Sequence, residues 1–149
     1  MPKSKWALLG LVGAALALLL IVPRGLWCLG PFGKPLSCPA KAVACVLGEA
    51  EGEPYEGKLI LSHALINRGS FLGVYGCGSR RVKERLYPRS ALVEATMAWT
   101  EAVRTHDKTD LARGAANWLS VDDPWHKASW VTYCEPRVQV SKHIFLKCP

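Results

Sequence analysis

The chain has 149 residues, of which 50% are hydrophobic and 21% are charged, and its formal net charge is +7. This length accommodates one globular domain, and the charged fraction excludes wholesale disorder. A single long apolar run and an excess of basic over acidic residues exclude a polytopic membrane protein, a multidomain enzyme and an acidic disordered tail.

The N-terminal residues are typical of an export segment. Lys3 and Lys5 precede an apolar run over residues 6–22. Both a cleaved signal peptide and a membrane anchor have this pattern. No convincing cleavage site follows the run, so we expect an uncleaved transmembrane anchor over residues 1–22 and an extracytoplasmic domain. A secreted protein is the alternative. Residues 23–39 are rich in Pro and Gly and predict a linker.

The next segments predict helices. Apolar spacing favours helices over residues 40–50 and 55–68, with a break at Gly52 and Pro54. Residues 70–89 predict a loop region with room for one helical turn. A third helix is expected over residues 90–105, where four side chains share one face: Leu92, Thr96, Trp99 and Val103.

The C-terminal part changes character. Residues 137–148 alternate at Val138 and Val140 and predict a short β region, and residues 114–120 and 130–134 are further strand candidates. The predicted fold class is therefore α+β, dominated by helices, with a small C-terminal β region.

The cysteines and histidines carry no metal-binding motif. An even number of cysteines after an export-type segment favours disulfides in an oxidising compartment, with fifteen possible pairings; buried free thiols are the alternative. Cys45 precedes Glu49 by one helical turn. One hypothesis is that a disulfide between Cys45 and Cys28 restrains the region around Glu49. No metal site is expected, because the four histidines are widely scattered: His63, His106, His126 and His143.

Four glutamates gather in an otherwise basic chain, at positions 49, 51, 53 and 56. Glu49 follows an apolar helix, where a carboxyl group can be partly buried. Burial favours the protonated form, which a general acid needs. The alternative is a solvated acidic loop, with Glu56 near the N-terminal dipole of the next helix. Composition alone favours this second interpretation.

The order of residues around Glu49 changes that balance. Residues 44–68, ACVLGEAEGEPYEGKLILSHALINR, resemble the opening motif of the SleB-type cell wall hydrolases, which cleave peptidoglycan. Residues 114–120 and 143–147 are similar to later parts of the family, whereas residues 70–89 depart from it. The resemblance defines a domain over residues 40–149. Eleven positions of the opening motif match: Gly48, Glu49, Ala50, Gly52, Glu53, Pro54, Tyr55, Glu56, Gly57, Asn67 and Arg68.

The resemblance implies a lysozyme-like fold in which Glu49 is the catalytic acid and no metal or organic cofactor is required. It would protonate the glycosidic oxygen between N-acetylmuramic acid and N-acetylglucosamine. Lytic transglycosylase chemistry is favoured, because only one carboxylate has motif support. Asp122 and Asp123 are candidates for a second carboxylate, and a turn before Pro124 is their alternative role.

Other residues have expected supporting roles. Asn67 is expected to hold the end of its helix. Four side chains are candidate sugar-binding residues, each with a structural role as the alternative: Tyr55, Trp118, Trp125 and His143.

The expected partners are peptidoglycan glycan strands and, through the N-terminal helix, a membrane. The basic charge suits approach to anionic wall polymers or anionic lipid. Nucleic acid is not expected, because the basic stretch at residues 80–85 has no interleaved aromatic residues. A non-catalytic wall-binding or structural protein on the same fold is the alternative function.

Overall fold

The computed structural model describes residues 39–124 and 128–149. The expected anchor over residues 1–22, the linker up to residue 38 and Trp125 lie outside these ranges. Within them, no helix combines the length and the apolar character that a bilayer crossing requires.

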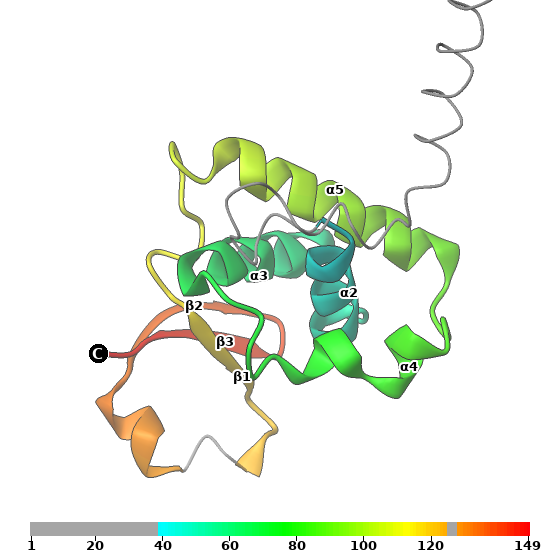
Figure 1. Cartoon of the computed structure of the whole chain (residues 1–149). Coiled ribbons are helices and arrows are strands. Elements are labelled where there is room, and N and C mark those ends of the chain that lie inside the picture. The colour runs from blue at the N-terminus through cyan, green and yellow to red at the C-terminus, as the bar shows by residue number, and fades with distance from the viewer. Residues whose placement is uncertain (1–38, 125–127) are drawn as a thin grey trace, which may run out of the picture.

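Two helices form where the spacing predicted them, α2 (Pro39–Ala50) and α3 (Tyr55–Arg68). Gly69 ends α3 with a φ of 67°, a left-handed conformation that glycine adopts without steric cost. Every side chain from Gly57 to Leu65 is buried. The helix is covered all round because α2 and α5 both pack against it (Figure 1).

The third helix, α5 (Arg89–Thr105), also forms as predicted, but its buried face is different. Of the expected stripe, only Trp99 is buried, whereas Leu92 and Val103 are exposed. Small side chains let the α5 backbone approach α3 closely, and larger ones would hold the two helices apart. The buried face is therefore formed by Ala91, Ala95, Ala98, Trp99 and Ala102.

The predicted loop region over residues 70–89 contains two short helical pieces, η3 (Tyr75–Gly78) and α4 (Arg80–Lys83). Ser79 caps α4, since its hydroxyl oxygen accepts a hydrogen bond from the Val82 amide. The η3 turn packs against α2, so this loop forms a wall next to the end of α2.

The C-terminal β region is a three-stranded antiparallel sheet of β1 (Asn117–Ser120), β2 (Glu135–Val140) and β3 (His143–Lys147). The strand order is β1-β3-β2, and β3 is central. Figure 1 shows the sheet below α3, on the side away from α5. The expected strand over residues 130–134 is wrong, because this segment lies in a 3-10 helix, η5 (Ser129–Tyr133).

Candidate active site

Glu49 lies in the last turn of α2, and both of its carboxylate oxygens are held. The backbone amide of Gly76 donates a hydrogen bond to Oε1 at 2.5 Å. The indole Nε1 of Trp118 donates to Oε2 at 3.1 Å. The carboxylate is partly buried. Two donors from distant parts of the chain therefore fix the orientation of this side chain.

The first donor depends on two glycines. The backbone of η3 passes so close to α2 that a Cβ atom on Gly76 would lie 2.5 Å from the carbonyl carbon of Gly48 and 2.7 Å from Cγ of Glu49. A Cβ atom on Gly48 would overlap the carbonyl oxygen of Gly76. Only glycine at both positions lets the loop amide reach the carboxylate.

A disulfide reinforces the same contact. Cys45 of α2 is bonded to Cys77, the residue that follows Gly76. The hypothesis that Cys45 pairs with Cys28 is therefore wrong. The disulfide of Cys45 nevertheless lies next to Glu49, as expected. A second disulfide joins Cys134 to Cys148 at the edge of the sheet. Cys28 and Cys38 lie outside the described residues.

Glu49 opens onto a cleft of about 670 Å³ between the η3 loop and the sheet. The second donor, Trp118, comes from β1, where it lies opposite Phe145 of β3. His143 begins β3 and also lines the cleft. The lining residues are Glu49, Arg68, Gly73, Val74, Tyr75, Asn117, Trp118, Leu119, Ser120, Asp123, Trp130 and His143.

A second glutamate of the cluster reaches the cleft indirectly. Glu53 is only 9% exposed, and its Oε1 pairs with Nδ1 of His143 at 3.1 Å. Its other oxygen has no hydrogen-bond partner among the described residues. Lys58, also buried, donates to the backbone oxygen of Glu53 and pairs with Glu94. Glu53 is therefore an orienting partner for the ring of His143.

The end of α3 joins the two walls of the cleft. The guanidinium group of Arg68 donates to Oδ1 of Asn117 at 2.8 Å and to the carbonyl oxygen of Leu72 at 2.9 Å. Asn67 donates to Asp110 and to the carbonyl oxygen of Ala115, both at 3.0 Å. Asn67 thus has a structural role, but its side chain holds the loop that precedes β1 and not, as expected, the end of its own helix.

The structure separates the four expected sugar-binding residues. Trp118 and His143 line the cleft with Glu49, whereas Trp125 lies outside the described residues. Tyr55 is not in the cleft: its hydroxyl donates to Oε2 of Glu101 on α5 at 2.7 Å, and its ring packs against the contact between α3 and α5. The motif position of Tyr55 therefore has a structural role here.

The two aspartates before Pro124 also differ from each other. Asp123 lines the cleft, and its backbone amide donates to the carbonyl oxygen of Ser120 in a turn. Asp122 is exposed and pairs with Lys142 at 3.8 Å. Of the two candidates for a second carboxylate, only Asp123 thus reaches the cleft.

Two aromatic residues of the cleft were not predicted from the sequence. Tyr75 is 90% exposed and Trp130 is 43% exposed, and both line the cleft. Tyr75 stands beside Gly76 in a glycine-rich loop, but its exposure is visible only in the structure. Trp130 had no signal, since its segment was expected to be a strand.

The scatter of the histidines along the sequence was also misleading. His63 and His106 meet in space, with their Nδ1 atoms 2.9 Å apart. Neither residue lines the cleft with Glu49.

Comparison with known proteins identifies the fold. The chain is similar, at 22% identity and a TM-score of 0.53, to the catalytic domain of the germination-specific lytic transglycosylase SleB from Bacillus anthracis, over 73% of this chain and 93% of that one. The catalytic domain of the Bacillus cereus SleB protein matches with the same identity and TM-score, over 73% and 88%. No protein-family model and no curated protein matches the sequence. The described residues thus have the fold of the SleB-type cell wall hydrolase catalytic domain.

Proposed function

We propose that this protein is a peptidoglycan-cleaving lytic transglycosylase with Glu49 as its general acid and base. The observation that carries the proposal is the fixed carboxylate of Glu49 at a cleft large enough for sugar rings. The fold shared with two SleB catalytic domains supports the same chemistry, because one of them is described as a lytic transglycosylase. The coincidence of motif, fold and cleft favours an enzyme over a wall-binding module.

The two donors to Glu49 give its oxygens different roles. The hydrogen bond to Oε1 from the Gly76 amide is shorter than the one to Oε2 from the Trp118 indole, so we assign the transfer of the proton to Oε2. From Oε2 the proton passes to the glycosidic oxygen between N-acetylmuramic acid and N-acetylglucosamine, and the bond from C1 to that oxygen breaks. The developing positive charge at C1 then lies near a carboxylate.

The second step returns the proton. The ionised Glu49 accepts the proton of the 6-hydroxyl group of the muramic acid residue, and that oxygen attacks C1. The product has a 1,6-anhydro end, no water is consumed, and Glu49 regains its starting form. This route needs one carboxylate. If the enzyme is instead a hydrolase, Asp123 is the cleft residue placed to assist a water molecule.

Other cleft residues supply binding. The exposed rings of Tyr75 and Trp130 offer apolar faces on which pyranose rings stack. His143, oriented by Glu53, supplies a polar group on the opposite wall. These assignments extend the sugar-binding role that we expected for Trp118 and His143 to two aromatic residues on loops.

We further propose an extracytoplasmic location, with residues 1–22 as a membrane anchor or export signal. The disulfides Cys45–Cys77 and Cys134–Cys148 support it, because such bonds persist in oxidising compartments.

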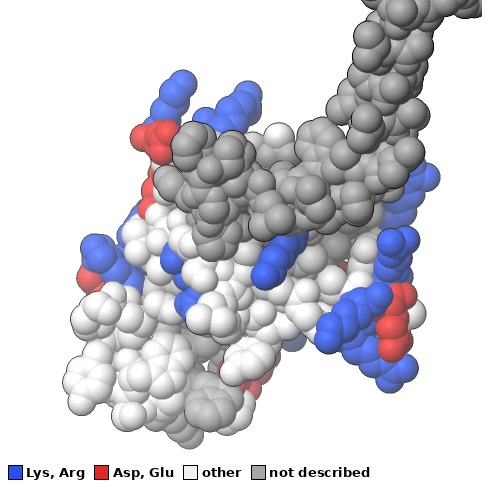
Figure 2. Space-filling model, viewed as in Figure 1, with Lys and Arg blue, Asp and Glu red and all other residues white. Residues whose placement is uncertain are grey.

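Figure 2 shows Lys and Arg side chains at several separate places on the visible face, and a broad uncharged area at its lower left. A spread charge of this kind favours general attraction to an anionic wall over recognition of one polyanion.

The test is mass spectrometry of muropeptides released from purified peptidoglycan by the full-length protein. We expect 1,6-anhydro ends from the natural protein and from Glu56→Gln, and none from Glu49→Gln. Glu56 is the matched control, because it is exposed in the first turn of α3 and undergoes the same substitution. New reducing ends would identify a hydrolase. Wall pelleting without any cleavage would favour the non-catalytic alternative, and equal activity of both variants would overturn the role of Glu49.

A further inference from the structure

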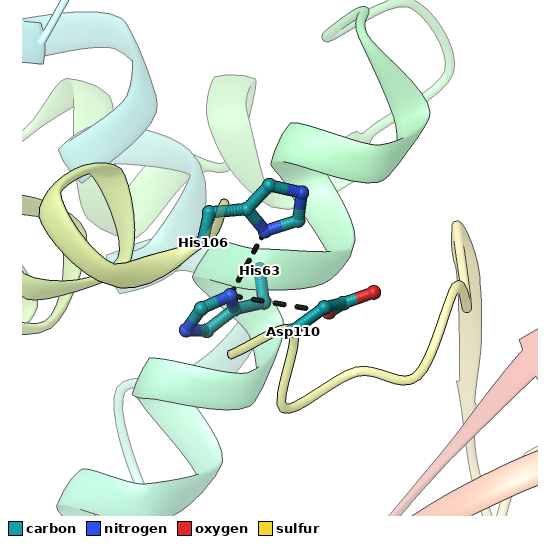
Figure 3. A group of neighbouring side chains, drawn as sticks. All are labelled: His63, His106 and Asp110. Atoms are coloured by element: carbon teal, nitrogen blue, oxygen red, sulfur yellow. Dashed lines mark hydrogen bonds and ion pairs between the residues drawn. The ribbon is translucent and has the colours of Figure 1, made fainter. Parts of the chain in front are cut away.

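Three side chains with metal-binding atoms meet on the side of α3 that packs against α5. His63 lies in the middle of α3, His106 directly follows α5, and Asp110 lies in the next loop (Figure 3). Nδ1 of His63 is 2.9 Å from Nδ1 of His106 and 3.9 Å from Oδ1 of Asp110. All three ligand atoms lie within 4.8 Å of one another. None of these residues lines the cleft.

The protonation states of the cluster suit a cation. Burial lowers the pKa of His63, and the neighbouring His106 lowers it further, whereas Asp110 and Glu101 act in the opposite direction. Burial alone would raise the pKa of Asp110. Hydrogen bonds from Asn67 and from the amides of Gly114 and Ala112 outweigh burial and lower that pKa, so the carboxylate is ionised.

Hydrogen bonding within the protein does not use the cluster fully. The two Nδ1 atoms face each other, and a single proton is all that fits between them at 2.9 Å. Nε2 of His63 is buried and has no partner among the described residues. When Nδ1 of His63 binds a cation, Nε2 carries the ring proton of the neutral imidazole. A cation that replaces the shared proton would make both Nδ1 lone pairs useful.

The donor set selects the ion class. Two imidazole nitrogens and one carboxylate oxygen suit Zn²⁺, whereas Ca²⁺ and Mg²⁺ prefer oxygen ligands alone. Ligand atoms around a tetrahedral Zn²⁺ lie about 3.4 Å apart, so the distances of 2.9 Å and 3.9 Å each need to change by about 0.5 Å. The third pair, His106 and Asp110, has its ligand atoms within 4.8 Å and must reach the same spacing. His106 is partly exposed and lies outside the helix core, so it has room for this movement. Hydrogen bonds from Asn67, Ala112 and Gly114 hold Asp110 in place.

We propose that His63, His106 and Asp110 form a binding site for Zn²⁺ or a similar first-row divalent ion. The partial exposure of His106 and Asp110 leaves the fourth position open to water. The bound ion would join α3, the end of α5 and the loop that leads to β1. The three ligands lie outside the cleft, so the ion would take no direct part in glycan cleavage.

The test uses the tag-free full-length protein, first stripped with EDTA and then titrated with ZnCl₂. We expect one equivalent of zinc to bind at this site and raise Tm, and Co²⁺ to give the visible absorption bands of a four-coordinate complex. His106→Gln and Asp110→Asn should each weaken binding at least tenfold. His143→Gln is the matched control, because it removes a histidine from outside the cluster and should leave both signals unchanged.

The variants are compared in EDTA first, where far-ultraviolet circular dichroism shows whether each one folds. If one ligand variant fails to fold, the other decides the question. The absence of a zinc-dependent shift in the natural protein, or equal zinc affinity in a folded ligand variant, would overturn the proposal. No peptidoglycan enters this experiment, so its outcome is independent of the proposed enzymatic function.

Discussion

Gly48 and Gly76 lie back to back, and their contact brings a loop amide to the catalytic candidate. A Cβ atom on Gly48 would be 1.8 Å from the carbonyl oxygen of Gly76. The contact therefore explains in physical terms why glycine precedes Glu49 in the motif. The contact also joins Glu49, which the sequence motif identified, to the loop around Gly76, for which the sequence predicted no function.

The substitution Gly76→Ala should separate the loop from α2. Its Cβ atom would lie 2.6 Å from the backbone nitrogen of Glu49, so the loop must move and its amide must leave the carboxylate. We expect a loss of about 1–3 kcal/mol in unfolding free energy from overpacking, and a loss of most of the activity. Gly52→Ala is the control, because no atom lies within 4 Å of the added carbon. Thermal unfolding measures the loss of stability, and muropeptide release measures the loss of activity. Full activity of Gly76→Ala would contradict the role of the Gly76 amide in orienting Glu49.

The substitution Trp118→Phe removes the donor to Oε2 of Glu49 and keeps an aromatic ring in β1. A hydrogen bond to a charged group contributes about 1.5–3 kcal/mol, so we expect the cleavage rate to fall roughly 10- to 100-fold. Sedimentation with cell walls should remain close to that of the natural protein, because the other cleft residues are untouched. An unchanged rate would show that the indole N–H has no part in the reaction.

The helices could be predicted from the sequence because local signals agreed with the tertiary structure. Apolar spacing placed α2, α3 and α5 within about one residue of their observed bounds. The buried face of α5 was predicted wrongly, because its contact with α3 is made by alanines and size rather than hydrophobicity decides close packing. Leu92 and Val103 are more hydrophobic than alanine and yet lie outside the contact.

Only the part of the site that lies within one short stretch of sequence could be predicted. Glu49 was identified from its neighbours along the chain, whereas Gly76 and Trp118 reach it from 27 and 69 residues away. No periodicity carries that information, since long-range contacts depend on how helices and loops pack. The same reason explains why Tyr55 was misplaced: its motif position was correct, but the side chain points to α5.

Tyr55→Phe tests the corrected role of this residue. Burial and the hydrogen bond to Glu101 raise the pKa of Tyr55 to about 12, so its hydroxyl remains a donor at neutral pH. We expect a loss of about 1 kcal/mol in unfolding free energy and no change in muropeptide release. The raised pKa means that the stabilisation is complete below pH 10 and disappears as the pH rises towards 12. A large loss of activity with normal stability would return Tyr55 to the substrate site.

The two disulfides should have different effects on activity. In the chain-entropy description, closing loops of 32 and 14 residues contributes about 4 and about 3 kcal/mol of unfolding free energy. Their thermodynamic contributions are therefore similar. Cys45–Cys77, however, lies beside the amide that holds Glu49, whereas Cys134–Cys148 ties the chain at the edge of the sheet.

We therefore expect the double variant Cys45→Ala and Cys77→Ala to lose activity at temperatures where it is still folded. Without the bond, the η3 loop can leave α2, and the Gly76 amide then no longer orients the carboxylate. The double variant Cys134→Ala and Cys148→Ala is the matched control, with a lowered Tm and near-normal activity well below it. Both are assayed by muropeptide release at a temperature where circular dichroism shows a folded chain. Equal activity losses in the two variants would mean that the disulfides act through global stability alone.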